Sequence, residues 1–302
     1  MPSRALSGIP EVPPVPLMSL ASLSRDLRLF AKYHLRRRAE TYPAPETELG
    51  VAPLRYEAVA YAAQIRRLES PRFEVSTEET VTYEGRAHPL LCVRSRGAAP
   101  RTLLVLAGVH GNEPAGLLAV PALVEGWSSE RVRLVILTPV NPVGAAERSR
   151  FNGEGYDINR DFHRFDTVEA RCVRRIFERE SPDFVISLHE GPQSDTFVFA
   201  NRLVPPELVH EALARLAAGG TKLATRDYMG RRLAPPGLST VGHGVHLLHQ
   251  LWALTLGMKA SLTFSDERRV PELVLESSWR ISDEAARVRA HVDLVRAVGE
   301  LL

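Results

Sequence analysis

The sequence has few cysteines, no long uncharged apolar run and little net charge. Cys92 and Cys172 are its only cysteines, too few for a disulfide framework or a thiolate metal site, so a reducing compartment is the simplest setting. A net charge of +2 gives no electrostatic reason to expect a nucleic-acid partner. Without a charge-free apolar run of about eighteen residues or the apolar segment of a signal peptide, we expect a soluble, cytoplasmic protein with no membrane span.

The length and composition are those of a globular protein. The 302 residues are 44% hydrophobic and 25% charged, which suits one large α/β domain or two small ones. Residues 1–20 are rich in proline and serine, so we expect a flexible N-terminal arm. Residues 21–302 contain no linker long enough to divide them and are expected to form one domain that starts with helices over 21–70. The basic amphipathic stretch "LASLSRDLRLFAKYHLRRR" permits a membrane-surface or nucleic-acid role, but a packed helix with solvated arginines is favoured.

Apolar runs alternate with amphipathic segments along the rest of the chain. The expected strands are "VTYEG", "HPLLCVRS", "TLLVLAGV", "VRLVILTPV", "DFVISLH", "TFVFA" and "ELVLESS", and the expected helices include "YEAVAYAAQIRRLES", "AGLLAVPALVEGW", "DTVEARCVRRIFERE" and "PPELVHEALARLAAGG". This alternation predicts an α/β fold with a mixed, largely parallel central sheet flanked by helices, and with ligands at the carboxyl ends of the strands. The last helix is expected to begin with Ser282 as its N-cap.

A histidine and a glutamate stand three residues apart in "AGVHGNEP", directly after a predicted strand. On a tight turn His110 and Glu113 can converge on one ion. The plainer interpretation is a turn histidine beside a glutamate that favours the start of a helix. The motif alone does not decide between them.

A second histidine reaches the same edge of the sheet. His189 lies at the end of the strand "DFVIS", and with His110 and Glu113 it completes the two imidazoles and one carboxylate of a catalytic zinc site. Glu190 is expected to point to the opposite face. We therefore predict one Zn2+ per chain at His110, Glu113 and His189.

The stretch "NPVGAAERSRFNGEGYDINRDFHR" predicts a long functional loop, because it has little periodicity and several glycines. Two arginines near a metal suit the recognition of a carboxylate and of a developing oxyanion. The alternative is a solvated, salt-bridged loop. Six polar residues crowd into this part of the chain: Arg150, Asn152, Asp157, Asn159, Arg160 and Asp161.

Taken in order, these motifs resemble the zinc carboxypeptidase family, the carboxypeptidase A-like enzymes together with their succinylglutamate desuccinylase and aspartoacylase relatives. The resemblance spans roughly residues 80–280. It rests on H-x-x-E at His110 and Glu113, on "NP" at 141–142, on "RFNGEGYDINR" at 150–160 and on His189. The combination is more specific than any one motif.

The resemblance implies a role for each matched residue. His110, Glu113 and His189 would be the zinc ligands of a catalytic domain spanning residues 21–302, and Arg150 would polarise the scissile carbonyl. The family's general base, a glutamate on a late strand, matches Glu276 in "ELVLESS"; Glu272, at the start of that strand, lies at the wrong edge. The residues that match the pair holding the substrate's terminal carboxylate are Asn159 and Arg160.

One feature of the family is displaced. Its members carry a substrate-contacting tyrosine shortly before the catalytic glutamate, whereas no tyrosine occurs here between Tyr228 and Glu276. Tyr228 or one of His243, His246 and His249 would have to substitute.

Three functions stay open. The first is a metallocarboxypeptidase acting on a small peptide. The second is an N-acyl amino acid deacylase of the aspartoacylase type. The third is a zinc- or peptide-binding module without turnover.

Overall fold

The computed structural model describes residues 56–227, 230–240, 251, 253–255 and 257–302. The expected arm over 1–20, the basic stretch, Tyr228, His243, His246 and His249 lie outside these residues. The described helices and strands are α3 (Ala58–Arg66), β1 (Phe73–Tyr83), β2 (Arg86–Ser95), β3 (Arg101–Ala107), α4 (Pro114–Glu125), β4 (Val132–Thr138), α5 (Pro142–Glu147), the 3-10 turn η2 (Ile158–Arg160), α6 (Val168–Glu180), β5 (Phe184–Gly191), β6 (Phe197–Ala200), α7 (Pro206–Ala218), β7 (Leu238–Thr240), α9 (Ser261–Glu267), β8 (Glu272–Ser278) and α10 (Glu284–Leu301).

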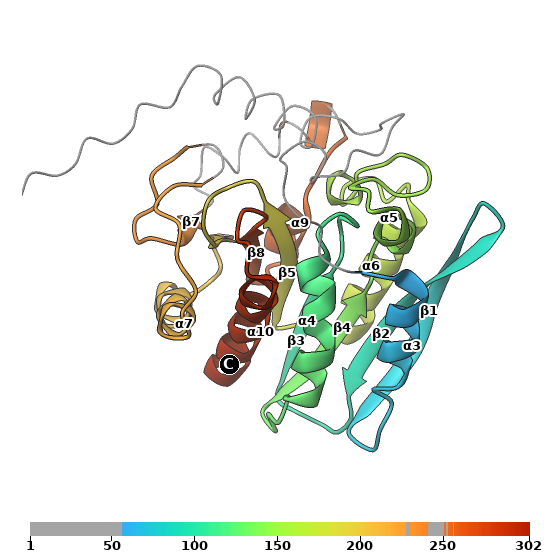
Figure 1. Cartoon of the computed structure of the whole chain (residues 1–302), viewed down its shortest axis with the longest axis horizontal. Coiled ribbons are helices and arrows are strands. Elements are labelled where there is room, and N and C mark those ends of the chain that lie inside the picture. The colour runs from blue at the N-terminus through green and yellow to red at the C-terminus, as the bar shows by residue number, and fades with distance from the viewer. Residues whose placement is uncertain (1–55, 228–229, 241–250, 252, 256) are drawn as a thin grey trace, which may run out of the picture.

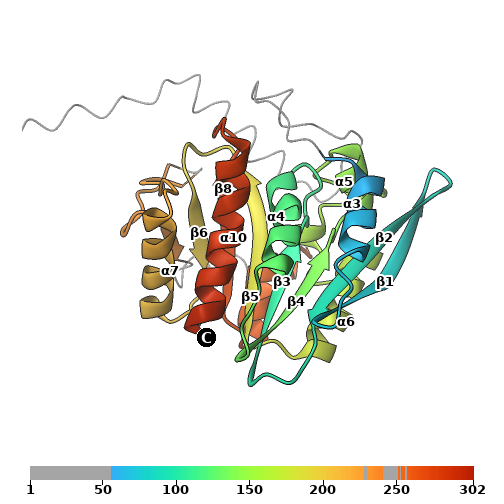
Figure 2. The same ribbon diagram turned by 60° about the horizontal axis from the view of Figure 1, so that its bottom comes forward.

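The strands form one mixed sheet of eight strands in the order β1-β2-β4-β3-β5-β8-β6-β7. The four central strands β4, β3, β5 and β8 run parallel to one another, while β1 and β2 add an antiparallel edge. Figures 1 and 2 show this sheet crossing the molecule between two helical layers. The predicted fold class is confirmed. Because the central strands are parallel, their carboxyl ends meet at one edge of the sheet.

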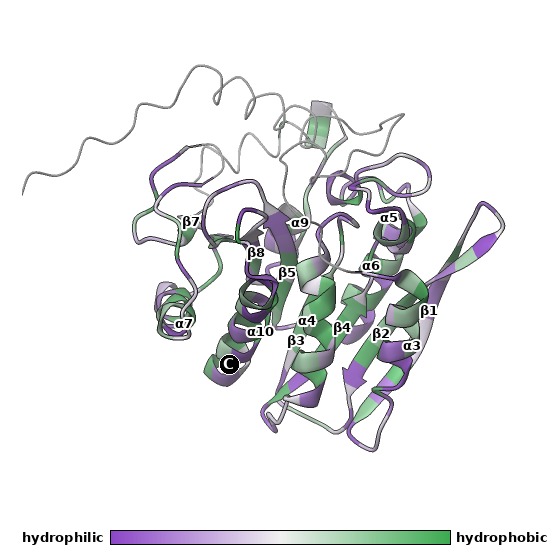
Figure 3. Cartoon of the chain, viewed as in Figure 1, coloured by the Kyte–Doolittle hydropathy of each residue, from purple (hydrophilic) through white to green (hydrophobic). Residues whose placement is uncertain are grey.

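Helices cover both faces of the sheet, and the apolar strands match that arrangement. Along β3, Leu103 and Val105 pack into the cluster formed with α3, α4, α7 and α10, whereas Leu104 and Leu106 pack on the opposite face into the cluster that includes residues of α6 and α9. A strand buried on both faces needs the continuous apolar run that "TLLVL" provides. Figure 3 shows hydrophobic residues along the central strands and α4.

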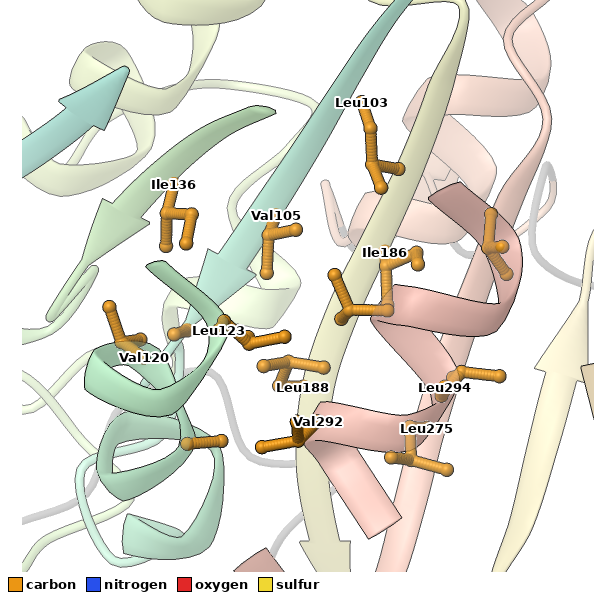
Figure 4. Close-up of a cluster of buried hydrophobic side chains, with 14 of the residues drawn as sticks. Leu103, Val105, Val120, Leu123, Ile136, Ile186, Leu188, Leu275, Val292 and Leu294 are labelled. Carbon is orange, nitrogen blue, oxygen red and sulfur yellow. The ribbon is translucent and has the colours of Figure 1, made fainter. Parts of the chain in front are cut away.

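The larger cluster fixes the position of the strand ends. Figure 4 shows Ile186 and Leu188 of β5 between side chains of α4 and α10, and both residues are fully buried. Burying such side chains contributes about 1.5–3 kcal/mol each. Gly116 of α4 allows a close approach here, since an added Cβ would lie 2.7 Å from the Cβ of Leu188. The strand that carries His189 is therefore held tightly against α4, the helix that follows Glu113.

Two local expectations need correction. The N-cap of α10 is Asp283, not Ser282, because the Asp283 carboxylate accepts a hydrogen bond from the backbone N–H of Ala286 at 3.1 Å. The stretch expected to be one long loop begins with a helix, α5, which the Asn141 side chain caps by accepting from Gly144 N–H at 2.8 Å. Among the described residues, no helix combines the length and apolar character needed to cross a bilayer.

Candidate active site

Three parallel strands deliver the predicted residues to one edge of the sheet. His110 and Glu113 follow β3, His189 lies on β5, and Glu276 lies on β8. In the register between β5 and β8, His189 is paired with Glu276. Paired residues of neighbouring parallel strands project on the same face, so these side chains are neighbours as a result of sheet pairing alone.

The turn that carries His110 and Glu113 is packed closely against α5. An added Cβ on Gly111 would lie 1.8 Å from the backbone carbonyl carbon of Gly144, so a side chain at position 111 would force the two segments apart. Gly111 thus lets this turn lie directly on the helix that follows β4. The side chain of Glu113 makes no capping bond to α4, which leaves its carboxylate available for other contacts.

The side chains of His110, Glu113 and His189 converge in a buried cluster. Nδ1 of His110 lies 2.8 Å from one oxygen of Glu113, and Nδ1 of His189 lies 2.7 Å from the other. The two Nδ1 atoms are 3.0 Å apart, and each side chain is 2% exposed. These three residues form a group that can hold a metal ion, with all ligand atoms within 4.8 Å of one another.

Asp157 determines which nitrogen of His110 faces this cluster. Its carboxylate lies 3.1 Å from Nε2 of His110. Burial raises the pKa of Asp157, but the charge of Arg150 and the hydrogen bond from His110 outweigh burial and hold that pKa below the usual range. An ionised carboxylate only accepts hydrogen bonds, so Asp157 favours a proton on Nε2 and leaves Nδ1 as the nitrogen of His110 that would bind a metal.

The protonation states suit a metal. Burial lowers the pKa of His189, although the charge of Glu113 opposes this, so its neutral, ligating form is favoured. Burial raises the pKa of Glu113, but the two histidines outweigh it and keep that pKa low. The two Nδ1 atoms and the Glu113 carboxylate offer two nitrogen donors and one oxygen donor to a single ion, and donors of this kind suit zinc.

The contact between Asp157 and His110 gives a first testable consequence. Replacing Asp157 by Asn preserves the shape but removes the charge that holds the Nε2 proton of His110. We expect the affinity for Zn2+ to fall by about 10–100-fold, the usual effect of losing a carboxylate behind a metal-binding histidine. Competition with a chelating dye measures this directly. An unchanged affinity at matched thermal stability would contradict the role given to Asp157.

Arg150 lies against the same cluster. Its Nε donates to Asp157 at 3.0 Å, and its Nη1 lies 3.2 Å from Nδ1 of His110 and 3.4 Å from the Glu113 carboxylate. The residue is 4% exposed. Burial opposes its charge, but Asp157 and Glu113 outweigh that cost and raise the pKa of the guanidinium. A permanent positive charge therefore lies beside the candidate metal ligands.

Asn159 and Arg160 lie in the turn η2, packed on the segment that leads into α9. The side-chain oxygen of Asn159 accepts from the backbone N–H of Ser261 at 3.0 Å. Since a backbone N–H can only donate, this bond fixes the amide and turns the Nδ2 donor end away from Ser261. The backbone carbonyl of Arg160 accepts from Lys259 N–H at 3.0 Å, which anchors the turn.

Glu276 is half-buried at the end of β8. Burial, followed by the negative charge of Glu113, raises its pKa well above the ordinary carboxyl value, and Arg150 only partly offsets this. A raised carboxyl pKa favours proton exchange close to neutral pH. The structure thus brings all seven predicted site residues to one region of the sheet edge, with Glu276 electrostatically coupled to Glu113, Arg150 and Arg160.

The two glutamates set aside in the sequence occupy other positions. Glu190 points to the opposite face, as expected, where Arg287 of α10 donates to it at 2.6 Å. Glu272 is fully buried at the start of β8 and accepts hydrogen bonds from Ser187 and Ser261 at 2.9 and 2.8 Å. Neither carboxylate belongs to the group of three candidate metal ligands.

Sequence reasoning placed Asp157 in the polar stretch but assigned it no role. The signal was the regular "D-I-N-R" order, with Asp157 two residues before Asn159. The contact between Asp157 and His110 could not be predicted from the sequence, because 47 residues separate the two positions and only the folded chain brings them together.

Comparisons with known proteins agree with this arrangement. The succinylglutamate desuccinylase/aspartoacylase catalytic domain model matches residues 99–230. Carboxypeptidase 2 of Trichophyton tonsurans is 30% identical over 112 residues, which cover 32% of this chain and 21% of that protein. Murein peptide amidase A of Escherichia coli is 28% identical over 108 residues, which cover 35% of this chain and 45% of that protein. The chain thus spans less than half the length of either relative.

Solved structures show the same fold. A Shewanella denitrificans protein described as a metallopeptidase superposes with a TM-score of 0.62 at 20% identity, over 82% of this chain and 95% of that one. The chain thus shares its fold with this metallopeptidase and part of its sequence with a carboxypeptidase and an amidase. More narrowly, residues 99–230 are similar to the catalytic domain of the succinylglutamate desuccinylase and aspartoacylase enzymes.

Proposed function

We propose that this chain is a zinc-dependent hydrolase that cleaves an amide bond next to a free carboxylate, in the manner of a metallocarboxypeptidase. The observation that carries the proposal is the pairing of His189 with Glu276 across β5 and β8, which puts a carboxyl of raised pKa beside the His110, Glu113 and His189 cluster. A site that served only to hold a metal would need no such carboxyl and would close its fourth position with a protein ligand.

The residues suit each step of amide hydrolysis. His110, Glu113 and His189 would hold the zinc, which when bound supplies a Lewis acid that lowers the pKa of water toward neutrality. Glu276 takes a proton from the attacking water as the new carbon–oxygen bond forms. Arg150 donates to the oxygen of the tetrahedral species, a contact worth about 3–4 kcal/mol in other hydrolases. Glu276 then passes its proton to the leaving nitrogen as the carbon–nitrogen bond breaks.

Asn159 and Arg160 favour a substrate with a free carboxylate. The amide of Asn159 directs its donors away from Ser261, and the neighbouring guanidinium offers a further set of fixed donors. A carboxypeptidase and an N-acyl amino acid deacylase release the same kind of product, an amino acid with a free carboxylate. The two activities therefore differ mainly in the group on the acyl side of the bond.

The deacylase is the second candidate. It is favoured by the match of residues 99–230 to the succinylglutamate desuccinylase/aspartoacylase domain and by the sequence "HGNE" at residues 110–113. A cell-wall peptide is a further candidate substrate, by analogy with the Escherichia coli murein peptide amidase.

A substrate panel distinguishes these candidates. We expect hydrolysis of acylated dipeptides or of N-acyl amino acids with a free carboxylate, loss of activity on chelation, and little hydrolysis of the matching C-terminal amides.

Arg160→Ala is expected to lower kcat/KM by about 10–100-fold, since charge-assisted hydrogen bonds contribute about 1.5–3 kcal/mol. Arg164→Ala, a control on the same segment whose partner is the exposed Asp166, should leave kcat/KM unchanged. Equal rates on acids and amides would contradict carboxylate recognition.

A further inference from the structure

Gln193 is a buried residue near the site to which no role has yet been given. It lies between β5 and β6 and is 5% exposed. Its side-chain nitrogen donates to the backbone carbonyls of Glu276 and Ser277 at 2.9 and 3.0 Å, and its own backbone carbonyl accepts from the Ser278 hydroxyl. Because two carbonyls face the nitrogen, the orientation of the amide is determined.

The other end of this amide is an acceptor without a partner. Oε1 of Gln193 is buried, and no hydrogen bond reaches it from the residues that the structure describes. A Cβ added to Gly191 would lie 2.3 Å from this oxygen and 3.1 Å from Oε2 of Glu276. Gly191, two residues after His189 on β5, therefore lets the Gln193 amide pack directly against the strand, and both oxygens lie close to the same point above it. Leaving a carbonyl unpaired in a buried position costs about 1–3 kcal/mol, so a donor supplied by a ligand is the natural partner.

We propose that Gln193 is a substrate-binding residue whose Oε1 accepts a hydrogen bond from the N–H of the amide bond being cut. The inference rests on the proposed function. Glu276 must reach the leaving nitrogen in order to protonate it, and Oε1 of Gln193 lies beside the Glu276 carboxyl. An amide or a departing amine offers an N–H to this acceptor, whereas an ester of the same shape offers none. The residue would thus help the site to prefer amides over esters.

The test compares an amide substrate with its isosteric ester. In Gln193→Met, which keeps the length of the side chain, kcat/KM for the amide should fall about tenfold more than kcat/KM for the ester, the effect of one lost hydrogen bond to the amide N–H. Gln64→Met, an exposed glutamine of α3, is the control and should alter neither value. Loss of the Nε2 contacts to β8 would affect both substrates alike, so the change in the ratio isolates the acceptor.

Binding provides a second measurement that needs no turnover. A phosphonamidate inhibitor carries an N–H where the matching phosphonate carries an oxygen. The wild type should bind the phosphonamidate about tenfold more tightly, and Gln193→Met should bind the two equally. Equal losses for amide and ester, or an unchanged inhibitor preference, would overturn the assignment of Gln193 while leaving the proposed function intact. Failure of the wild type to hydrolyse any substrate of the panel would instead count against the proposed function.

Discussion

Glu276→Gln is expected to lower kcat by about 10³-fold without removing the metal. Glutamine has nearly the same shape as glutamate but cannot accept the proton of the attacking water or return it to the leaving nitrogen, and general acid–base catalysis is worth about 10²–10⁴-fold. Glu276 is absent from the His110, Glu113 and His189 group, so its replacement leaves that group complete. Single-turnover rates and metal analysis on the same sample measure both quantities.

Glu272→Gln is the matched control, since it makes the same chemical change on the same strand. Glu272 is fully buried, and burial raises the pKa of its carboxyl, so a neutral amide is better tolerated there than at an exposed carboxylate. We expect kcat within about threefold of the wild-type value, since Glu272 lacks the proton-transfer role of Glu276. If the Glu276 variant kept its turnover while the Glu272 variant lost it, the assignment of the base would be wrong. If both retained full activity, proton transfer by either glutamate would be excluded.

His189→Ala is expected to lower the affinity for Zn2+ by about 10³-fold, because about a third of the ligand set is lost and structural zinc sites bind with roughly 10–16 kcal/mol in total. Hydrolysis should fall with metal occupancy. Titration calorimetry with Zn2+ measures the affinity, and thermal unfolding of the metal-free protein checks that the fold is retained.

A second histidine variant controls for nonspecific binding. His210 lies exposed on α7, and His210→Ala should leave the affinity for Zn2+ at the wild-type value. Equal affinities in the wild type and in His189→Ala would mean that the ion binds elsewhere. The cluster would then be a buried ion-pair network without a metal.

Much of the fold follows from local patterns. The continuous apolar runs of β3, β4 and β5 predicted strands covered on both faces, and the order of motifs predicted that His110, Glu113 and His189 would meet. The order of the strands in the sheet could not be predicted from these local patterns. The position of β8 between β5 and β6 depends on long-range packing, and it is this position that puts Glu276 beside His189.

Other features of the site depend on distances that periodicity does not contain. Asp157 reaches His110 across 47 residues, and Gln193 is one glutamine in a loop whose importance appears only through its contacts with β8. The N-cap residue of α10 was predicted wrongly for a simpler reason. Ser282 and Asp283 are both good N-caps, and only the backbone geometry shows that Asp283 accepts the bond from Ala286.

Whether His110, Glu113 and His189 bind a zinc ion can be seen in crystals by anomalous X-ray scattering at the zinc absorption edge. We expect a single strong peak, about 2.0–2.2 Å from Nδ1 of His110, from Nδ1 of His189 and from a carboxylate oxygen of Glu113. Crystals grown with Zn2+ that show no peak among these three residues, or show a peak only at surface histidines, would contradict this prediction.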